Sequence, residues 1–338
     1  MNNKRMTGLI ENELGSKVSS FERVYGGINN ISLKCILENN KTYFVKKYVR
    51  DERLRLEREY SLFTFLHKKG LFKVPKPFFY DKDGYFAVYE FIKGEVKRIE
   101  SVNLSEMKDL ALYASKLHSI LPTDVNRKLV SEDAVLPVFS LSDHVDNMNF
   151  KLGRFNSYFR TLPDSSWIKK ILVKEKIKTR INFLLKSTLK DIPMSDLRKR
   201  IGSDKLRINH IDFGFHNVIY KKTTPYFIDY ELSGWDDPFR MIGDFMTHHK
   251  SLEISKKFKR IFLEKYIEFG KLDSLQEQRL LRTIKLMDIE WIATYLWSFT
   301  PEKISFRKES IKEFDRKKYT LEQIDKTKTR ILQLEEKQ

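Results

Sequence analysis

The hydrophobic pattern of this chain changes its period near Gly94, and that change limits the folds open to it. Before this point, residues 18–48 alternate apolar and polar side chains, as strands with one buried face do. Apolar residues then recur every three or four positions over 53–69, which is typical of a helix, and two further strands flank the turn Asp81–Gly84. Residues 1–92 therefore predict a small antiparallel sheet with one main helix.

The remainder of the chain is dominated by helical spacing. It predicts helices over 103–121, over most of 140–202 and from 239 onward, interrupted by short apolar runs at 206–232. The closing segment 309–338 predicts one charged helix with an apolar stripe at Ile311, Phe314, Leu321 and Ile324.

A mixed part followed by a larger helical part predicts an α+β fold of two lobes. A length of 338 residues suits two domains or one such unit. We expect a small N-terminal lobe at 1–92 and a helical C-terminal lobe at 96–338, joined at about 89–95.

The composition is strongly basic, with 64 Lys and Arg against 46 Asp and Glu and a net charge of +18. The basic residues are spread over the helical part without an arginine-rich arm, so we expect no nucleic-acid partner. The single cysteine, Cys35, excludes an internal disulfide and a Cys-based zinc site. No stretch reaches the roughly 18 apolar residues of a membrane span, and the N-terminus lacks a signal-peptide core. We therefore expect a cytoplasmic protein without membrane insertion.

The segment Asn209–Glu231 is the most informative for function. His210, Asp212 and Asn217 fit the pattern H-x-D-x-x-x-x-N, and Asp229 follows an apolar pair twelve residues after the asparagine. Kinase-type phosphoryl transfer needs a carboxylate that accepts the hydroxyl proton, together with an amide oxygen and a second carboxylate that hold Mg²⁺. Asp212, Asn217 and Asp229 supply these groups in that order. The alternative is a polar hairpin turn, in which Asp and Asn are turn formers.

A second alignment is possible, because Asp212-Phe213-Gly214 spells the metal motif of protein kinases. In that alignment an H-R-D-x-x-x-x-N loop should lie about 18 residues earlier. The candidate, Asp196, has neither a His two positions before it nor an Asn five positions after it. We therefore assign the catalytic loop to 210–217 and the metal motif to 227–231.

A kinase site also needs a strand lysine for the phosphates and a helix glutamate that holds this lysine. Lys46 lies in a predicted strand, and strand alternation places it on the face of Phe44, which favours it over Lys47. Glu59, on the next helix, is the expected partner, and Glu57 is the competitor.

Two further segments are candidates for nucleotide binding. The backbone of the Gly26-Gly27 turn, with Gly27 and with Ser32 or Asn30 beyond it, could cradle phosphate oxygens, although it lacks a full G-x-G-x-x-G. Glu90 and Ile92 follow an apolar strand where a two-lobed kinase has its hinge, whose backbone groups contact adenine.

Together these pieces resemble the aminoglycoside phosphotransferase and choline kinase superfamily, which has a protein-kinase-like fold. The resemblance runs from about Val24 to Trp297 and depends on the order and spacing of short motifs. These motifs are Gly26-Gly27 with Asn29-Asn30, Phe44-Val45-Lys46, Arg58-Glu59, Val74-Pro75-Lys76-Pro77, Glu90-Phe91-Ile92-Lys93-Gly94-Glu95, Leu117-His118-Ser119, the catalytic segment, and Gly234-Trp235-Asp236-Asp237-Pro238 with Asp244-Phe245.

The resemblance implies a role for each matching residue. Asp212 becomes the catalytic base, and the pairs Asn217 with Asp229 and Lys46 with Glu59 bind Mg²⁺ and phosphate. It also implies that His210 is structural and that Asp244 braces the catalytic loop. The chain departs from the family pattern at Ile211, where Gly is usual, and at His216, which is a candidate for substrate, phosphate or packing contact. The DFGFHN and GWDDP spellings resemble kinases found with surface-polysaccharide genes.

Substrate contact is expected from the C-terminal helices. Trp291 and Tyr295 share a helix face with Asp288, and aromatic rings with carboxylates suit a cationic or sugar ligand. Glu231 is a further candidate, and a role of the aromatic residues in the helix core is the alternative. The adjacent His248 and His249 would point about 100° apart on a helix, which favours solvation or packing over metal binding.

The prediction is an ATP- or GTP-dependent, Mg²⁺-requiring kinase that phosphorylates a hydroxyl of an amino alcohol, an aminoglycoside-like compound or a sugar, with a place in surface-polysaccharide metabolism among the options. Its partners would be a nucleoside triphosphate and this acceptor, and the sequence leaves the oligomeric state open. One alternative is a non-catalytic kinase-like binding protein. A protein kinase is disfavoured, because GWDDP stands where A-P-E would follow Asp229.

Overall fold

The computed structural model describes residues 3–25, 30–310 and 313–336, which form two compact units. Unit 1 comprises 1–102, 122–135 and 210–235, and unit 2 comprises 103–121, 136–209 and 236–338. The predicted catalytic loop and metal motif therefore belong to the same unit as the N-terminal residues.

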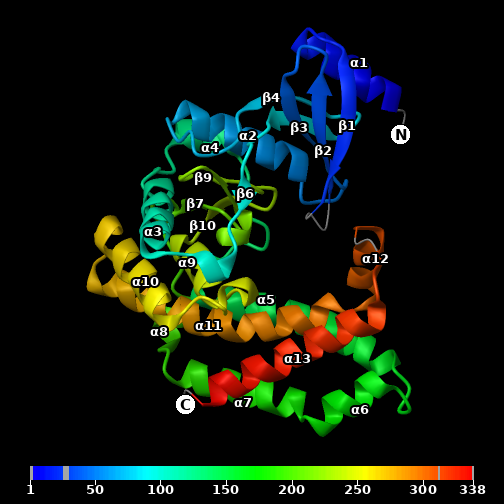
Figure 1. Cartoon of the computed structure of the whole chain (residues 1–338). Coiled ribbons are helices and arrows are strands. Elements are labelled where there is room, and N and C mark those ends of the chain that lie inside the picture. Colours follow the sequence, from blue (N-terminus) through cyan, green and yellow to red (C-terminus); the bar gives the residue numbers. More distant parts are fainter. Residues whose placement is uncertain (1–2, 26–29, 311–312, 337–338) are drawn as a thin grey trace. The chain divides into compact units, whose positions relative to one another are not determined.

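Unit 1 is built on a five-stranded antiparallel sheet in the order β1-β2-β3-β5-β4 (Figure 1). The strands are β1 (Val18–Val24), β2 (Ile31–Leu37), β3 (Thr42–Lys47), β4 (Pro77–Asp81) and β5 (Phe86–Glu90). In the central strand β3, Lys46 pairs with Ser32 on one side and with Ala87 on the other. The predicted strands before Gly94 are therefore present, with the expected turn at 81–84 between β4 and β5, whereas Gly26 and Gly27 lie outside the described residues.

Two helices complete this part of unit 1. Helix α1 (Asn3–Leu14) packs Met6 and Ile10 against Val45 and its neighbours on the sheet. This helix is absent from the sequence-based prediction, although the spacing of Met6 and Ile10 is helical. Because successive residues of a strand face opposite ways, Lys46 lies on the other face from Val45, and there it meets Glu59 of helix α2 (Arg55–Lys68).

The remaining elements of unit 1 include those that flank the predicted catalytic loop and metal motif. A three-stranded sheet has the order β6-β8-β9, with β6 (Glu95–Val96), β8 (Val218–Lys221) and β9 (Thr224–Phe227). The 3₁₀ turn η3 (Phe215–Asn217) leads into β8, and β9 ends two residues before Asp229. The other elements here are η1 (Ile99–Ser101), α4 (Asp124–Leu129) and the start of β10 (Gly234–Asp236).

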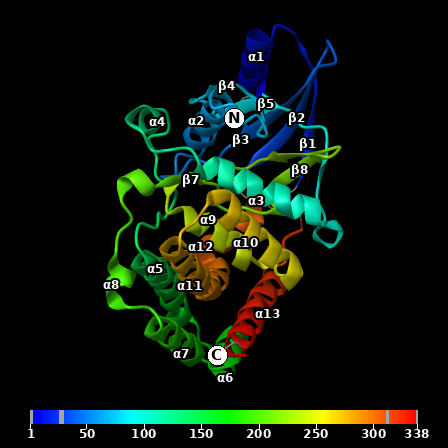
Figure 2. The same cartoon turned by 90° about the vertical axis from the view of Figure 1, so that its left-hand side faces the viewer.

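Unit 2 is almost wholly helical. Helix α11 packs against α5, α9, α13 and α7, and α3 packs against α10 (Figure 2). The helices are α3 (Leu104–His118), α5 (Leu141–Thr161), α6 (Trp167–Lys174), α7 (Ile177–Lys190), α8 (Met194–Arg198), α9 (Pro238–Thr247), α10 (Lys256–Gly270), α11 (Ser274–Ser298), α12 (Pro301–Ser310) and α13 (Arg316–Glu335). The short elements are η2 (Ser203–Lys205), β7 (Arg207–Asn209) and η4 (His249–Ser251). The predicted α+β class, a small antiparallel sheet with a larger helical part, is confirmed.

Two local predictions are wrong. The single closing helix is divided, because α12 ends at Ser310 and α13 starts anew, with the Asp315 side chain accepting bonds from the first backbone N–H groups of α13; Ile311 lies outside the described residues. His248 and His249 do not follow each other on a helix. Helix α9 ends at Thr247 and His248 is extended, so the two rings lie 4.4 Å apart.

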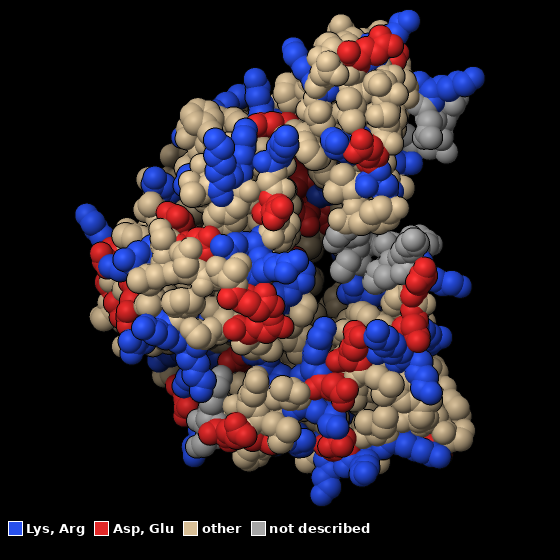
Figure 3. Space-filling view, in the orientation of Figure 1, with Lys and Arg blue, Asp and Glu red and all other residues tan. Residues whose placement is uncertain are grey.

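The surface and the helices bear on the partner predictions. On the face shown in Figure 3, Lys and Arg side chains lie scattered among acidic and uncharged residues. In the described part of the chain, no helix has both the length and the apolar character needed to cross a membrane.

His118 joins three segments of unit 2 and makes its stability depend on pH. Its Nδ1 accepts a bond from the Tyr266 hydroxyl at 2.8 Å, and its Nε2 donates to Asn209 at 3.0 Å. Burial lowers the pKa of His118 to about 3. Below the ordinary histidine pKa of about 6.5, the unfolded chain therefore binds a proton that the folded chain does not, and the free energy of unfolding falls as the pH falls.

We expect this linkage to cost about 2 kcal/mol between neutral pH and pH 5. His118→Gln removes the titration while retaining hydrogen-bonding groups, so it should flatten this slope. Urea unfolding of both proteins at pH 5 and pH 7.5 measures the difference. Equal slopes would contradict a neutral, buried His118.

Candidate functional site

The site is centred on Lys46, which β3 carries into the interior of unit 1. Its side chain is only 8% exposed, and its Nζ lies 2.8 Å from Oε2 of Glu59 and 2.7 Å from Oδ1 of Asp229. Glu231 Oε2 lies 3.3 Å away. One lysine therefore joins the sheet, helix α2 and the segment after β9, which are up to 183 residues apart in sequence.

These carboxylates determine the charge of Lys46. Burial alone would lower its pKa, but the negative charges of Asp229, Glu59 and Glu231 outweigh this effect and raise the pKa well above its usual value. Lys46 is thus a permanent cation. Tyr48, directly after β3, supports the pair, since its hydroxyl donates to Glu59 Oε2 and lies 2.7 Å from the hydroxyl of Tyr89.

The second oxygen of Glu59 fixes the segment after β9. Oε1 accepts the backbone N–H of Tyr230 at 2.8 Å, between Asp229 and Glu231. Because both oxygens of this buried carboxylate have partners, Glu59 positions the lysine and the metal motif together. The competing residue Glu57 lies elsewhere, where it accepts a bond from Tyr85 at 3.2 Å.

Glu231 is held by two cations and an amide. Its Oε1 is paired with Arg55 of α2, and its Oε2 accepts from the side chain of Asn30. Arg55 is also anchored by Asp51 at 3.0 Å. Through its pair with Arg55, the Glu231 carboxylate links the first turn of α2 to the metal motif. The Glu231 side chain is only 5% exposed.

Asp212 and Asn217 lie close together in the turn that precedes β8. The Asn217 side-chain N–H donates to the backbone oxygen of Asp212 at 2.9 Å and to its Oδ2 at 3.3 Å. His216 Nε2 donates to Oδ1 of Asp212 at 2.9 Å. These two side chains orient the Asp212 carboxylate. The Asp212 side chain is still 44% exposed, so its carboxylate is accessible.

His210 ties the catalytic loop to the metal motif. Its Nε2 donates to the backbone oxygen of Ile228 at 2.7 Å, and its ring packs against Tyr230 with centroids 4.2 Å apart. Burial lowers the pKa of His210, so this ring is a neutral structural donor. The backbone of Asn217 also bonds Ile228, at 3.0 Å, which fixes Asn217 beside the residue that precedes Asp229.

The backbone is unusual at both carboxylates of these two motifs. Asp212 and Asp229 have φ of 69° and 68°, in the left-handed region that residues other than Gly adopt rarely. Such conformations cluster at functional sites, because the surrounding structure must enforce them. Here the bonds to Asn217, Lys46 and Glu59 do so.

The oxygen donors near Lys46 fit a hard divalent cation. Glu59, Asp229 and Glu231 each offer a carboxylate oxygen, and these oxygens all lie within 4.8 Å of one another. Asn217 directs its amide N–H toward Asp212, which leaves its amide oxygen as a further possible ligand. Mg²⁺ prefers such oxygens and usually takes one or two carboxylates together with substrate phosphates.

The other predicted nucleotide-binding residues also belong to unit 1. Ser32 lies on β2 opposite Lys46, whereas Gly27 lies outside the described residues. Glu90 ends β5, and its N–H already donates to the carbonyl of Lys76 at 2.8 Å. Ile92 follows and is buried.

The remaining predicted residues lie in unit 2. Asp288, Trp291 and Tyr295 share one face of α11, but Tyr295 is buried and Asp288 is paired with Arg330 at 2.7 Å. Trp291 packs against His248, with ring centroids 4.6 Å apart. Asp244, the expected brace of the catalytic loop, is buried in α9. Asp196, the rejected alternative for the catalytic aspartate, pairs with Arg282 at 2.6 Å.

Sequence reasoning missed two residues of the site, and both had a detectable signal. Tyr48 continues the alternation of Phe44 and Lys46, so it shares their face of the sheet. Arg55 precedes Glu59 by four residues, so both lie on one face of α2. What the sequence lacked was the identity of their partners.

The model of the phosphotransferase enzyme family matches residues 21–248. No curated protein matches the chain in sequence.

Solved structures share the fold at low identity. A spectinomycin phosphotransferase with ADP and spectinomycin is 15% identical, with a TM-score of 0.66 over 95% of this chain and 98% of that one. An ethanolamine kinase of Plasmodium vivax is 17% identical, with a TM-score of 0.61 over 96% and 84%. A choline kinase of Streptococcus pneumoniae is 18% identical, with a TM-score of 0.59 over 98% and 99%. The likeness thus extends over nearly the whole chain.

Proposed function

Because the chain belongs to the phosphotransferase enzyme family, we propose that it is a kinase that transfers the terminal phosphoryl group of ATP or GTP to a hydroxyl of a small molecule. The observation that carries the proposal is the shared Lys46, within 2.8 Å of both Glu59 and Asp229. A strand lysine held by a helix glutamate next to a metal-binding aspartate is what kinase-type transfer requires.

In the proposed reaction, Asp212 is the general base. Its exposed carboxylate accepts the acceptor's hydroxyl proton, the hydroxyl oxygen bonds to the γ-phosphorus, and the bond to the β–γ bridging oxygen breaks, so that the nucleoside diphosphate leaves with its electron pair. Lys46 neutralises phosphate charge, and His216 keeps the Asp212 carboxylate in one orientation through its 2.9 Å bond. A positioned base of this kind contributes roughly 10²–10⁴-fold to the rate.

Asn217 and Asp229 are the proposed ligands of Mg²⁺. The cation, when bound, neutralises the charge that develops on the phosphates. The sequence alone makes Glu231 a candidate for substrate contact. Its burial and its bonds to Arg55 and Lys46 instead support a role in positioning the metal motif.

We further propose that the hinge lies at about 89–95, between an N-terminal lobe at 1–92 and a helical lobe at 96–338. Since the N–H of Glu90 is already bonded to Lys76, the proposed donor to adenine is the N–H of Ile92. The Gly26-Gly27 turn, with Ser32 near the start of β2, would cover the phosphates. Asp244 would brace the catalytic loop, and the nucleotide donor would put the reaction in the cytoplasm.

For the acceptor, the similar structures suggest a class. They are named for spectinomycin, ethanolamine and choline, which favours an amino alcohol or an aminoglycoside-like compound. A sugar is the remaining option. Of the predicted substrate contacts, Trp291 is the least constrained, because Tyr295 is buried and Asp288 is paired with Arg330.

The experiment that tests the proposal is a screen of amino alcohols, aminoglycosides and sugars for ATP- or GTP-dependent phosphorylation with Mg²⁺, with Asp212→Ala as the inactive control. An acceptor turned over by the wild type alone would support it. Nucleotide binding without turnover of any acceptor would favour a non-catalytic binding protein.

His216 gives a more specific test of the mechanism. His216→Ala removes the bond that orients Asp212 but leaves the base itself, so we expect kcat to fall by about tenfold, the worth of one hydrogen bond of roughly 1–1.5 kcal/mol. The KM for nucleotide should change little. Steady-state kinetics measures both, and a selective rise in KM would instead make His216 a phosphate contact.

A further inference from the structure

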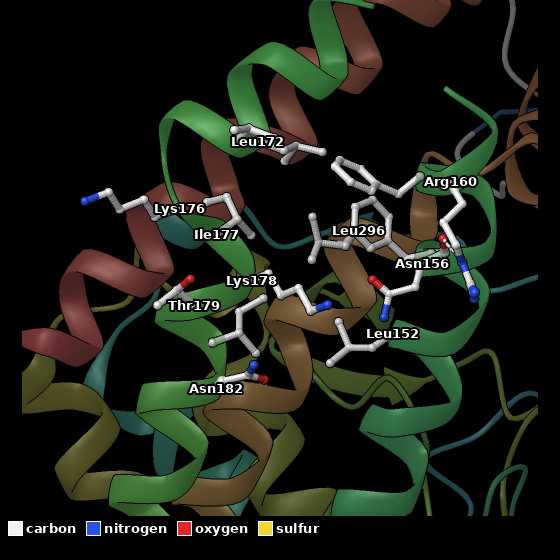
Figure 4. Close-up of a pocket in the computed structure, with 14 residues that line it drawn as sticks. Leu152, Asn156, Arg160, Leu172, Lys176, Ile177, Lys178, Thr179, Asn182 and Leu296 are labelled. Atoms are coloured by element: carbon white, nitrogen blue, oxygen red, sulfur yellow. Dashed lines mark hydrogen bonds between the residues drawn. The ribbon is translucent and has the colours of Figure 1, made fainter. Parts of the chain in front are cut away.

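Unit 2 contains a cavity of about 640 Å³ between helices α5, α6, α7 and α11 (Figure 4). Its wall is largely apolar and includes Phe155, Phe159, Leu172, Ile177, Ile181 and Leu296. The size and the apolar wall are typical of a site for a small organic ligand. No residue of the proposed phosphoryl-transfer site lines it, so it needs an explanation of its own.

The polar groups of this cavity lie together and are cationic or neutral. In Figure 4, Lys178 extends toward the side chain of Asn156. Arg160 also lies next to Asn156, because its Nε donates a hydrogen bond to the backbone carbonyl of Asn156 at 3.3 Å. Lys176 extends away from the cavity. Lys178 and Arg160 both line this cavity, and in this view Asn156 lies between them.

Nothing in the lining balances those charges. None of the residues that line the cavity is Asp or Glu. Glu175, which lies between α6 and α7 three residues before Lys178, has another partner: its carboxylate pairs with Lys328 at 3.3 Å. Among the described residues, neither Lys178 nor Arg160 forms an ion pair with a carboxylate.

We propose that this cavity binds an amphiphilic anion, a hydrocarbon chain with one carboxylate head group. The chain would lie against Phe155, Ile177 and Leu296, and the carboxylate would lie between Lys178 and Arg160. Lys178 and Arg160 are exposed at the edge of the cavity, so a carboxylate there would be near two cations without being buried. A neutral apolar ligand would gain nothing from either cation, and an inorganic anion would leave the apolar wall exposed to water. The proposal is independent of the proposed kinase activity.

Calorimetric titration of the full chain with octanoate, decanoate and dodecanoate tests the proposal. Each added CH₂ should tighten binding by roughly three- to fourfold, the value for burying one methylene. Decanol and decyltrimethylammonium should bind more weakly than decanoate, because they lack the negative head group.

Charge reversal locates the site. The double variant Lys178→Glu, Arg160→Glu should weaken decanoate binding by roughly tenfold or more at low salt. The matched control is Lys174→Glu, Lys186→Glu, which makes the same charge change on exposed lysines of α6 and α7 outside the lining. It should weaken binding less than twofold.

All four substituted side chains are exposed, so folding should survive, and circular dichroism verifies it. If the double variant does not fold, Lys178→Glu alone serves the same comparison. No saturable binding, equal binding of decanol and decanoate, or equal weakening in the matched control would each overturn the proposal.

Discussion

Asp212→Asn is expected to lower kcat by roughly 10²–10⁴-fold, because it removes the proposed base and little else. Asparagine tolerates the left-handed backbone that Asp212 adopts at φ 69°. Its side chain can still accept the bond from His216. The loss therefore reports the missing proton acceptor, whereas Asp212→Ala also removes that bond and strains the turn.

Nucleotide binding should survive in Asp212→Asn, since none of the bonds between Lys46, Glu59 and Asp229 involves Asp212. Calorimetry with a non-hydrolysable ATP analogue gives the affinity, and single-turnover kinetics gives the chemical step. Asp164→Asn is the matched control, because that side chain is 96% exposed and outside the site. A variant with full kcat would remove Asp212 from the mechanism.

The parts of the site that were predictable are those set by local periodicity. Strand alternation was enough to place Phe44 and Lys46 on one face, and the apolar pair before Asp229 includes Phe227, the last residue of β9. The choice between Glu59 and Glu57 was harder. It depends on the rotation of α2 about its axis, which tertiary packing decides.

What could not be predicted depends on contacts between distant segments. Arg55 and Glu231 are 176 residues apart, and no local pattern links them. The helix geometry assumed for His248 and His249 failed for a related reason. Helix α9 ends at Thr247, so the next two residues no longer follow helical spacing.

The net charge of +18 likewise does not reveal which basic residues have a specific role. Figure 3 shows basic side chains scattered among acidic ones on the visible face. Only a few have a distinct environment in the described residues. Lys46 is buried among three carboxylates, and Lys178 with Arg160 borders a cavity without any. Burial distinguishes Lys46, and a place beside a cavity without carboxylates distinguishes the exposed Lys178 and Arg160. A net charge contains neither kind of information.

Asp229→Ala is expected to abolish the Mg²⁺ dependence of nucleotide binding and to lower kcat by about 10³-fold or more. A metal ion supplies several kcal/mol of charge stabilisation to phosphoryl transfer, and each 1.36 kcal/mol is a factor of ten in rate. The structure adds a second expectation. Without Asp229, Lys46 keeps Glu59 at 2.8 Å and Glu231 at 3.3 Å, so it remains in position for phosphates.

Nucleotide should therefore still bind to Asp229→Ala, with an affinity that no longer responds to Mg²⁺. Titrations of ATP with and without excess Mg²⁺ compare the wild type, Asp229→Ala and Glu57→Ala. Glu57 contacts Tyr85 instead of Lys46, so its variant should behave as the wild type. If Mg²⁺ tightened binding equally in all three proteins, Asp229 would not hold the metal, and Glu59 with Glu231 would be the carboxylates left to do so.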